Sequence, residues 1–522
     1  MWRIDDPQGN ESAKIKYDIV PYTRGKGLDI GCGPYKAYNH FIGVDNLHHV
    51  REFGWETKPD IVSEADDLSL FADESMDFVF SSHTLEHVVD PEKTLKEWFR
   101  VIKVNGHLVL YLPSDKLYPK VGEPGANPDH KFNLNQQTVI TWMKSVGSWD
   151  LIENQLRDND NGPGEYGNEY SFYLVFKKLP DDVVAHKKSW AITKPDKSVC
   201  VVRYGGFGDM IQTSSIFPGL KAQGYHITMM TTPGGRDILV NDPHIDAFIL
   251  QDKEQVPNNE LGGYWAAWEK KFDKFINLSE SVETTLLIHQ GSALTRFPVS
   301  VRRKMLNINY TEMTHEIAGV PMPSFSKFYP TDIEKAWAKK QAPKAPVILW
   351  SLAGSSVHKT WPWLDQIVAR ILLETSATIV LVGDTLCQLL EAGWENEPRV
   401  MRRSGIWSIR ETLTFATEQA SLVIGPETGV LNAVGLDENI AKIITLSHSS
   451  TENLVKHWKN TVALIPPESV DCYPCHQMIY NFSNCRQNPE SGTAECQHNI
   501  SPELMWGAIM SWWGSHGNQQ QL

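Results

Sequence analysis

The sequence lacks a hydrophobic run long enough to span a bilayer, and its N-terminus, MWRIDDPQGNESAKIKYD, lacks the apolar core of a signal peptide. It is also poor in positive charge, because 49 Lys and Arg stand against 63 Asp and Glu, a net charge of -14. This balance argues against broad binding to nucleic acids or anionic membranes. We therefore expect a cytoplasmic protein whose seven cysteines are reduced thiols.

Short repeats and low-complexity tracts are also missing, which argues against a solenoid or a disordered chain. The 522 residues are too many for one ordinary core, so two or three domains are expected. With 41% hydrophobic and 21% charged residues, the composition is that of a globular enzyme. Hydrophobic strands alternate with amphipathic helical stretches, which predicts α/β layers with parallel sheets.

The alternation of hydrophobic strands and helical stretches begins at three points along the chain. We predict one α/β unit at each of these points. The expected boundaries are 1–180 for the first domain, 181–197 for a linker, and 198–340 and 341–522 for two further domains that face each other across a cleft. The last of these includes a tryptophan-rich terminal helix, PELMWGAIMSWWG, which either packs across the two preceding halves or exposes a patch for a partner. The expected strands are GLDIG, FIGVD, MDFVFSS, GHLVLYLP and SFYLVFKK, then SVCVVRYG, HITMMTT, AFILQ and FDKFINL, then VILWSLAG, ATIVLVGD, ASLVIGP and KIITLSH.

A first glycine loop, LDIGCGP, follows the first expected strand. Glycines there let the backbone approach a ligand with its amides free to donate. The next strand, FIGVD, ends in Asp45, where an acid can accept hydrogen bonds from ribose hydroxyls, as in dinucleotide-binding folds. The alternative is a tight strand–loop turn without a ligand.

The surrounding run, DIVSEADDLSLFADESMDFVFSSHTLEHVVDPEKTLKEWFRVIKVNGHLVLYLP, resembles class I S-adenosylmethionine (SAM)-dependent methyltransferases of the type 11-like, small-molecule kind. The resemblance covers most of residues 25–178. It implies that Asp29, Gly31 and Gly33 cradle the methionine part of SAM, that Asp45 holds the ribose, and that Glu64 and Ala65 border the adenine. It also places Ser82 and His83 beside the transferred methyl group.

Methyl transfer to oxygen or nitrogen often needs a general base, and His83, His87 and His130 are candidates. His83 has the best position, and the alternative for each is a structural histidine. Only nine residues separate Gly33 from Gly43, where many members of that family have a longer first helix. This departure suggests a more open cofactor site or a domain without activity.

A second glycine loop, RYGGFGDMIQTSS, follows the strand SVCVVRY. It lacks the lysine–hydroxyl ending of a phosphate-binding loop, and no ribose acid follows the next strand. Its informative residue is Asp209, which could take a proton from a sugar hydroxyl. The alternative is an aspartate that caps the helix beginning near Met210.

This loop and three later segments resemble family-9, heptosyltransferase-like glycosyltransferases, which are inverting enzymes of the GT-B fold with two facing Rossmann-like domains. SLAGSSVHKTWP carries Lys359, LVGD ends in Asp384, and IGPETGVLNAVGL carries Glu427, Thr428 and Gly429. The resemblance implies that Asp209 is the base, and that Lys359 and the turn at Thr428 stabilise the departing nucleoside diphosphate. Gly208 and Asp384 complete the expected donor site. The family usually has aspartate in place of Glu427 and a histidine near Asn432, so the sugar is left open.

Four cysteines near the C-terminus, Cys472, Cys475, Cys485 and Cys496, have the spacing C-x2-C-x9-C-x10-C. Such a set suits four-coordinate binding of zinc or iron in a structural role, with His476 and His498 as other candidate ligands. The alternative is four reduced cysteines without metal. A cysteine-ligated iron finger of similar pattern occurs in a subset of the family-9 enzymes.

Together these patterns predict a bifunctional enzyme that uses SAM and a nucleotide-sugar donor, for example an ADP-heptose-like one, on a glycan, glycolipid or protein acceptor. A first alternative keeps only the glycosyltransferase active, with the first domain as a docking or sensing module. A second alternative is a non-enzymatic scaffold that binds sugar nucleotides.

Overall fold

The structure is a computed structural model that describes residues 10–48, 59–159, 168–180, 195–279, 281, 293–322, 327–344 and 346–516. The chain divides into two compact units, 1–195 with 251–271, and 196–250 with 272–522. Residues 251–271, which the sequence places in the second predicted domain, therefore belong to unit 1. Most of the predicted linker, residues 181–194, lies outside the described residues.

Unit 1 has one seven-stranded sheet of order β3-β2-β1-β4-β5-β7-β6, parallel except for β7, which runs antiparallel to β5 and β6. Its strands are β1 (Gly27–Ile30), β2 (Ile42–Asp45), β3 (Ile61–Val62), β4 (Met76–Ser82), β5 (Ile102–Pro113), β6 (Trp149–Arg157) and β7 (Ser171–Lys178). Its helices are α1 (Ser12–Ile15), η1 (Val20–Tyr22), η2 (Leu85–His87), α3 (Pro91–Val101), α4 (Gln136–Met143), η3 (Asn258–Glu260) and α8 (Leu261–Glu269).

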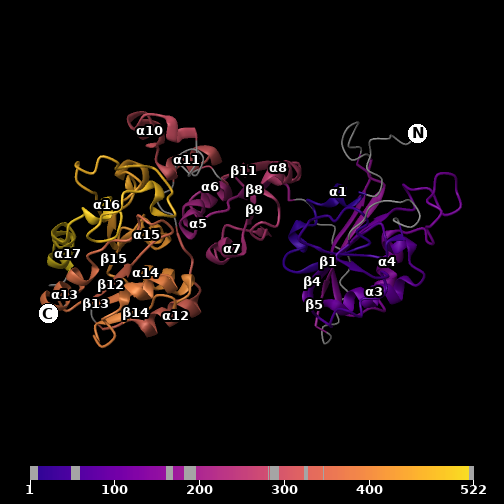
Figure 1. Cartoon of the computed structure of the whole chain (residues 1–522), viewed down its shortest axis with the longest axis horizontal. Helices are drawn as coiled ribbons and strands as arrows, with labels where there is room; N and C mark the ends of the chain where they lie inside the picture. Colours follow the sequence, from indigo (N-terminus) through magenta and orange to yellow (C-terminus); the bar gives the residue numbers. More distant parts are fainter. Residues whose placement is uncertain are drawn as a thin grey trace. The chain divides into compact units, whose positions relative to one another are not determined.

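Helix α3 shows how the sequence fixes a local element of this unit. Asp90 caps it by accepting a hydrogen bond from the Lys93 amide, and Pro91 occupies its first turn. Leu95, Trp98 and Phe99 then bury one face against the sheet. Figure 1 shows α3 and α4 beside β4 and β5.

Unit 2 holds two parallel sheets, of order β10-β9-β8-β11 and β14-β13-β12-β15-β16-β17. The strands of the first are β8 (Ser198–Val202), β9 (His226–Thr231), β10 (Ala247–Leu250) and β11 (Lys274–Asn277). Those of the second are β12 (Val347–Ser351), β13 (Thr378–Val382), β14 (Val400–Arg402), β15 (Leu422–Pro426), β16 (Ala441–Thr445) and β17 (Thr461–Leu464). The predicted α/β class with parallel sheets is confirmed.

The helices of unit 2 alternate with these strands. They are α5 (Phe207–Ser214), α6 (Phe217–Ala222), α7 (Pro233–Leu239), η4 (Ala293–Arg296), α10 (Val299–Leu306), α11 (Tyr310–Ala318), α12 (Asp332–Gln341), α13 (Leu364–Glu374), η5 (Thr385–Glu391), α14 (Ile409–Glu418), α15 (Gly429–Val434), η6 (Thr451–Val455), η7 (Phe482–Asn484), α16 (Glu495–His498) and α17 (Pro502–His516). The tryptophan-rich α17 packs against α13, β16 and β17 and buries Met505, Ile509 and Trp512. None of the described helices is long and apolar enough to cross a bilayer.

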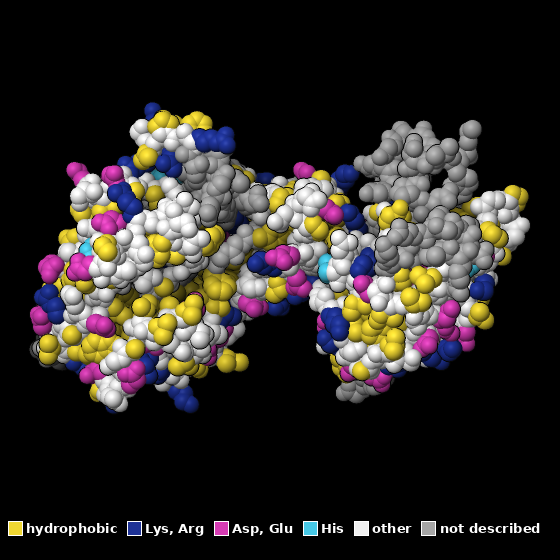
Figure 2. All heavy atoms as spheres, viewed as in Figure 1, with side chains coloured by type: hydrophobic (Ala, Val, Ile, Leu, Met, Phe, Trp, Pro, Cys, Tyr) yellow, Lys and Arg dark blue, Asp and Glu magenta, His cyan; other side chains and the backbone are white. Residues whose placement is uncertain are grey.

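The surface drawn in Figure 2 carries basic and acidic side chains interspersed among hydrophobic and uncharged ones. On that face no large area of a single sign is visible among the residues in colour. The distribution of charge therefore does not identify a binding site on this face. The candidate sites are located instead from the strand order of the sheets and the residues at the strand ends.

Candidate functional site

In each sheet, the order in which the strands are added changes direction at a central point. The predicted site residues lie after the strands at that point. The order reverses at β1 and β4 in unit 1, at β8 in the first sheet of unit 2, and at β12 and β15 in the second. In parallel sheets, ligands bind beyond the carboxyl ends of the strands at such a reversal. The two glycine loops follow β1 and β8, and Glu427 follows β15.

The first glycine loop turns sharply after β1. Gly31 has φ +72°, and a Cβ atom there would lie 2.0 Å from the Thr84 hydroxyl oxygen. Gly33 also has a positive φ, and its amide donates to the Asp45 carboxylate over 2.9 Å. The loop is thus held against the ends of both β2 and β4, as a ligand cradle at this reversal requires.

The two acids predicted for the cofactor already accept backbone hydrogen bonds. Asp45 accepts from Gly33 and, over 2.8 Å, from the Leu47 amide, while buried Asp29 accepts from Ala37 over 2.8 Å. Burial raises the pKa of Asp29 to about 7. Because each carboxylate oxygen can accept two hydrogen bonds, Asp45 retains acceptor capacity for a ribose.

The remaining predicted cofactor residues lie along neighbouring strand ends. Glu64 accepts a hydrogen bond from the Asn46 side chain over 2.9 Å, and the Ala65 carbonyl accepts from the Trp98 indole over 2.6 Å. The Ser82 hydroxyl oxygen, at the end of β4, is buried and has no partner among the described residues. An orphaned hydroxyl beside an open glycine loop is a feature that a bound polar cofactor would explain.

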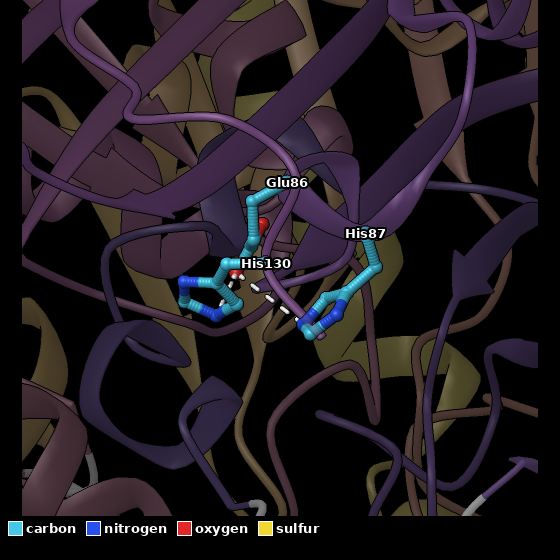
Figure 3. Close-up of side chains that lie close together, drawn as sticks. All are labelled: Glu86, His87 and His130. Atoms are coloured by element: carbon cyan, nitrogen blue, oxygen red, sulfur yellow. Dashed lines mark ion pairs between the residues drawn. The ribbon is translucent and has the colours of Figure 1, made fainter. Parts of the chain in front are cut away.

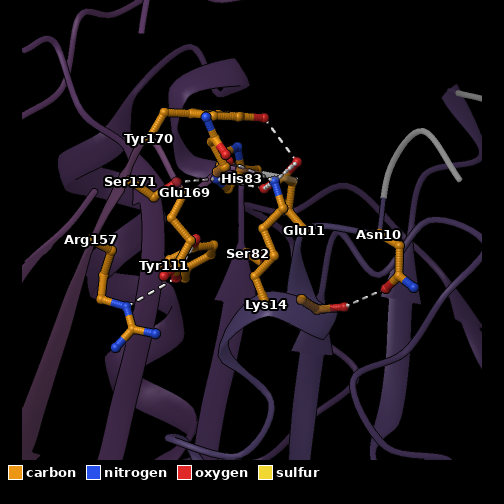
Figure 4. Close-up of polar contacts among 12 residues, drawn as sticks. Asn10, Glu11, Lys14, Ser82, His83, Tyr111, Arg157, Glu169, Tyr170 and Ser171 are labelled. Carbon is orange, nitrogen blue, oxygen red and sulfur yellow. Dashed lines mark hydrogen bonds and ion pairs between the residues drawn. The ribbon is translucent and has the colours of Figure 1, made fainter. Parts of the chain in front are cut away.

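His83 follows β4 and lies in a polar network (Figure 4). Its backbone has φ 50°, an unusual conformation for a non-glycine residue that is found at functional sites. Its Nε2 atom lies 2.9 Å from the Ser171 hydroxyl and 3.8 Å from Glu11. Tyr170 donates to Glu11 over 2.8 Å, which ties β7 to the start of the described chain. Burial lowers the pKa of His83 to about 4, so its ring is neutral near pH 7.

His87 and His130, the other two candidate bases, lie on either side of Glu86, a residue that the sequence analysis did not single out. Figure 3 shows the three side chains converging. The available signal was Glu86 itself, an acid between the apolar Leu85 and His87 on a short turn after a strand.

Unit 2 contains a cleft of about 1010 Å³ between its two sheets. Its lining includes every residue predicted for glycosyl transfer: Gly208, Asp209, Lys359, Asp384, Glu427, Thr428 and Gly429. Residues from both halves of the unit thus meet at one site, although they are far apart in sequence. A volume of this size is suited to a nucleotide-sized ligand.

Asp209 lies in the first turn of α5, and its carboxylate has two partners. One oxygen accepts from the Gly206 amide over 2.7 Å, which makes Asp209 part of the helix cap. The other pairs with the buried Arg203 guanidinium over 2.7 Å. The structure therefore supports the capping role, and it also leaves lone pairs on an acid that lines the cleft.

Lys359 is a buried cation on the opposite wall of the cleft. Burial lowers its pKa, whereas the nearby Glu427 and Asp209 favour its charged form. A desolvated ammonium facing a cleft interacts more strongly with an anionic ligand than an exposed lysine would.

The Glu427 carboxylate is hydrogen-bonded to the loop that follows β16. One oxygen accepts hydrogen bonds from the Ser447 and His448 amides over 2.7 and 3.1 Å, and the other accepts from the Ser449 hydroxyl over 3.0 Å. His448 Nδ1 lies 2.6 Å from that second oxygen. Glu427 therefore holds the loop 447–449 in place. Sequence analysis missed this loop, although its run of hydroxyls after a strand, TLSHSS, was a signal.

Asp384 and Thr428 stand at the N-cap positions of short elements at the cleft. The Asp384 side chain accepts from the Cys387 amide over 3.1 Å at the start of η5, and Thr428 precedes α15. The starts of α5 and α15 approach closely, because a Cβ on Gly429 would lie 3.0 Å from the Gly208 nitrogen. Glycine at these positions thus allows the two halves of the cleft to meet.

The cysteines of the C-terminal region gather around a small apolar cluster. Cys472, Cys485 and Cys496 pack with Val470 and Ala494. Burial raises the pKa of Cys485 to about 11 and that of Cys475 to about 12. Thiolates here would need a cation to stabilise them, and the metal site stays a prediction.

The two histidines near the cysteines differ in their surroundings. Buried His476 has no hydrogen-bond partner for either ring nitrogen among the described residues. His498 instead has Nδ1 3.0 Å from the Ser491 hydroxyl. Of these two candidate metal ligands, His476 is therefore the one whose ring nitrogens lack a hydrogen-bond partner among the described residues.

Comparison with known proteins gives one family match. Residues 28–110 match a family model described as a methyltransferase domain, which confirms the predicted resemblance of this part of the chain. An uncharacterized protein of Methanocaldococcus jannaschii is 28% identical over 133 residues, 24% of this chain. The match spans 64% of that relative's length.

Solved structures similar to the chain include proteins of both kinds that the sequence resembles. A glycosyl transferase family 9 protein from Veillonella parvula has a TM-score of 0.45 at 14% identity, covering 62% of this chain and 99% of its own. ADP-heptose lps heptosyltransferase II of E. coli has a TM-score of 0.43 at 14% identity, covering 61% and 99%. A SAM dependent methyltransferase from Archaeoglobus fulgidus has a TM-score of 0.24 at 21% identity, covering 32% and 92%.

Proposed function

We propose that the chain is a bifunctional transferase, which transfers a glycosyl group in the cleft of unit 2 and a methyl group in unit 1. The observation that carries the first activity is the cleft itself, with Asp209 on one wall and buried Lys359 on the other. The two activities on one chain suggest a common glycan or glycoconjugate acceptor, and the donor is a nucleotide sugar.

In the proposed glycosyl transfer, Asp209 accepts the proton of the acceptor hydroxyl as the oxygen attacks the anomeric carbon of the donor. The bond from that carbon to the diphosphate breaks as the new bond forms, with inversion. Arg203 and the Gly206 amide fix the carboxylate, so that its remaining lone pairs point in a set direction. This pre-orientation is what a positioned base needs.

Lys359 stabilises the diphosphate that leaves. Its charge lies in a desolvated wall, so it favours the extra negative charge of the departing group more than the charge of the ground state. Burial lowers the pKa of Lys359, and Glu427 opposes this effect by favouring the charged form. Glu427 also positions the loop 447–449 along the cleft.

The residues of unit 1 fit SAM, whose sulfonium supplies the methyl group when it is bound. Gly31 and Gly33 form the turn, Asp45 retains acceptor capacity for ribose hydroxyls, and the buried Ser82 hydroxyl lacks a partner among the described residues. His83 is neutral at physiological pH and lies directly after β4, so its ring can receive a proton from the acceptor.

The glycosyl transfer is tested with Lys359→Met and Asp209→Asn in the full chain, assayed with a panel of ADP-, GDP-, UDP-, CDP- and dTDP-sugars. Lys359→Met keeps most of the buried volume and should lower kcat by about 10²–10³-fold. Asp209→Asn keeps an acceptor for the Gly206 amide and should lower kcat by about 10²–10⁴-fold. Because it removes the charge that pairs with the buried Arg203 guanidinium, it should also lower the melting temperature, which is measured alongside the rate. Lys456→Met, at a partly exposed lysine in ion pairs with Glu312 and Glu452, is the matched control.

The binding and activity results distinguish a bifunctional enzyme from a glycosyltransferase with a docking module and from a scaffold without activity. Melting-temperature increases with SAM and with one class of nucleotide sugar would support two donor sites, because a ligand of the folded state stabilises it by mass action. Stabilisation by nucleotide sugars alone would favour an enzyme with a docking module. Donor binding without any turnover would favour a scaffold, and full activity of Asp209→Asn would remove the proposed base.

A further inference from the structure

Unit 1 contains a buried acid with an unsatisfied carboxylate. Glu86, in the turn η2, has no exposed surface, and no other described residue hydrogen-bonds either of its carboxylate oxygens. Three imidazoles approach the same oxygen, with nitrogens of His83, His87 and His130 at 3.7, 3.9 and 3.7 Å from Oε1. A buried polar group left in this way needs an explanation.

The distances are too long for hydrogen bonds and close to those between the ligands of a metal ion. Zinc binds nitrogen and oxygen at about 2.0–2.2 Å, so the edges of its coordination tetrahedron measure about 3.4 Å. The ligand atoms of Glu86, His87 and His130 all lie within 4.8 Å of one another. Small side-chain rotations would bring the three atoms to a common cation (Figure 3).

The donor set also suits a cation. The imidazoles of His87 and His130 each have a ring nitrogen that can donate a lone pair. The Glu86 carboxyl is buried, and no other described residue donates a hydrogen bond to it. A divalent cation would stabilise the ionised carboxylate, and two imidazoles with one carboxylate are a common donor set for such ions.

The backbone holds the two sides of the cluster together. The Lys131 amide donates to the Glu86 carbonyl over 2.8 Å, and the Lys131 ammonium donates to the His87 carbonyl.

We propose that Glu86, His87 and His130 bind one divalent transition-metal cation, for which Zn²⁺ is the first probe. Three protein ligands leave at least one coordination position open for water or a substrate oxygen. The His87 side chain is 31% exposed, which gives the ion a path from solvent. His83 Nδ1 lies 3.7 Å from the same carboxylate oxygen of Glu86.

If unit 1 transfers methyl groups, the chemical class of the ligand at the open coordination position can be inferred. Only this inference about the ligand rests on the proposed function. A hydroxyl oxygen bound to the cation would lose its proton more readily, and the His83 ring, whose Nδ1 lies 3.7 Å from Glu86 Oε1, would be the nearby base. The acceptor class would then be an alcohol, such as a sugar hydroxyl. Metal binding itself is tested without any activity measurement.

The experiment uses the full chain without a histidine tag, dialysed against a chelator and then titrated with ZnCl₂, with calorimetry and elemental analysis as readouts. Glu86→Gln keeps the shape of the side chain and removes its charge, and His130→Asn removes a nitrogen ligand. Glu153→Gln and His107→Asn are matched controls, because Glu153 accepts a hydrogen bond from Tyr22 and His107 makes an edge-to-face contact with the Tyr22 ring. Any metal bound by the cysteines is common to all these proteins and cancels in the comparison.

We expect each ligand variant to bind one Zn²⁺ per chain less than the wild type and both controls. Loss of a ligand should weaken this site by more than about 100-fold, since changes to outer partners already cost 10–100-fold. Equal zinc content in the wild type and Glu86→Gln would overturn the proposal. If Glu86→Gln does not fold, His87→Gln replaces it, because His87 is partly exposed. Equal zinc content in the wild type and His87→Gln would then overturn the proposal. Loss of methyl transfer with unchanged zinc content would count against the site, and loss of zinc with no methyl transfer in any variant would count only against the proposed function.

Discussion

Replacing Glu427 by glutamine should destabilise unit 2 strongly, even before any ligand binds. The carboxylate is buried and accepts hydrogen bonds from Ser447, His448 and Ser449, and it lies near the buried charge of Lys359. Although burial raises it, the pKa of the Glu427 carboxyl lies well below its usual range, because His448, Lys359 and the Ser447 amide stabilise the anion. The anion is therefore the form that holds the loop 447–449.

The magnitude follows from the loss of one partner of a buried charged network, which typically costs about 3–5 kcal/mol. For a unit of roughly 300 residues, 1 kcal/mol corresponds to about 1.5–2 °C, so the melting temperature should fall by about 5–10 °C. The sign of the pH dependence follows from the lowered pKa. The contribution of Glu427 is complete above the ordinary carboxyl range and is lost as the pH falls through the lowered pKa.

Differential scanning calorimetry of the ligand-free full chain measures this effect, with Glu468→Gln, at an exposed glutamate in the same half, as the matched control. Addition of SAM identifies the transition of unit 1 if that unit binds it. If Glu427→Gln melts within about 2 °C of the wild type but no longer binds the sugar nucleotide, then Glu427 contacts the donor directly. The assignment of Glu427 to the loop would then be refuted.

Three further changes test other parts of the chain. Burial lowers the pKa of His107 to about 4, so unit 1 should lose about 2–3 kcal/mol from this group as the pH falls from about 6.5 to 4, and His107→Gln should flatten that part of a pH-dependent urea titration. Gly429→Ala should push α15 away from the Gly208 nitrogen and lower glycosyl transfer more than thermal stability, as initial rates and calorimetry would show. Trp361→Phe should cost about 1–3 kcal/mol in chemical denaturation, because it leaves the buried Ile500 carbonyl without the indole N–H that donates to it over 2.9 Å.

The sequence predicted the central strands because those strands are continuously apolar. β8, β12 and β13 are buried along their whole length, and their β-branched runs are typical of parallel sheets. The strands it missed lie at or next to sheet edges. β3 has only two residues, and the half-exposed β6, WDLIENQLR, carries polar residues through its length. Such strands form because a neighbouring strand offers hydrogen bonds, which a local pattern does not reveal.

The same distinction explains which site residues were found. Asp209 lies in the first turn of the helix that follows β8, and Lys359 and Thr428 lie in the segments that follow β12 and β15. A glycine or proline marks each of these turns. The role of Glu427 depends on three residues about twenty positions later, and the cluster at Glu86 depends on a histidine 44 residues away, as the numbering shows. These partners become neighbours only through the parallel connections of the sheets, so spacing alone could not pair them.

The two glycine loops occupy equivalent places, after the strand where each sheet reverses its order, and yet their acids differ in a way that separates their chemistry. Asp45 stands at the end of the neighbouring strand β2 and accepts the amide of Gly33, so its carboxylate faces the loop from outside. Asp209 stands within the loop's own helix and accepts the amide of Gly206, so its carboxylate moves with the loop. The end of the strand next to β8, His226–Thr231, carries no acid that could hold a ribose. We therefore propose that the first arrangement holds a nucleoside across two strands. We propose that the second presents an acid to an acceptor, while the nucleotide lies on the opposite wall of the cleft.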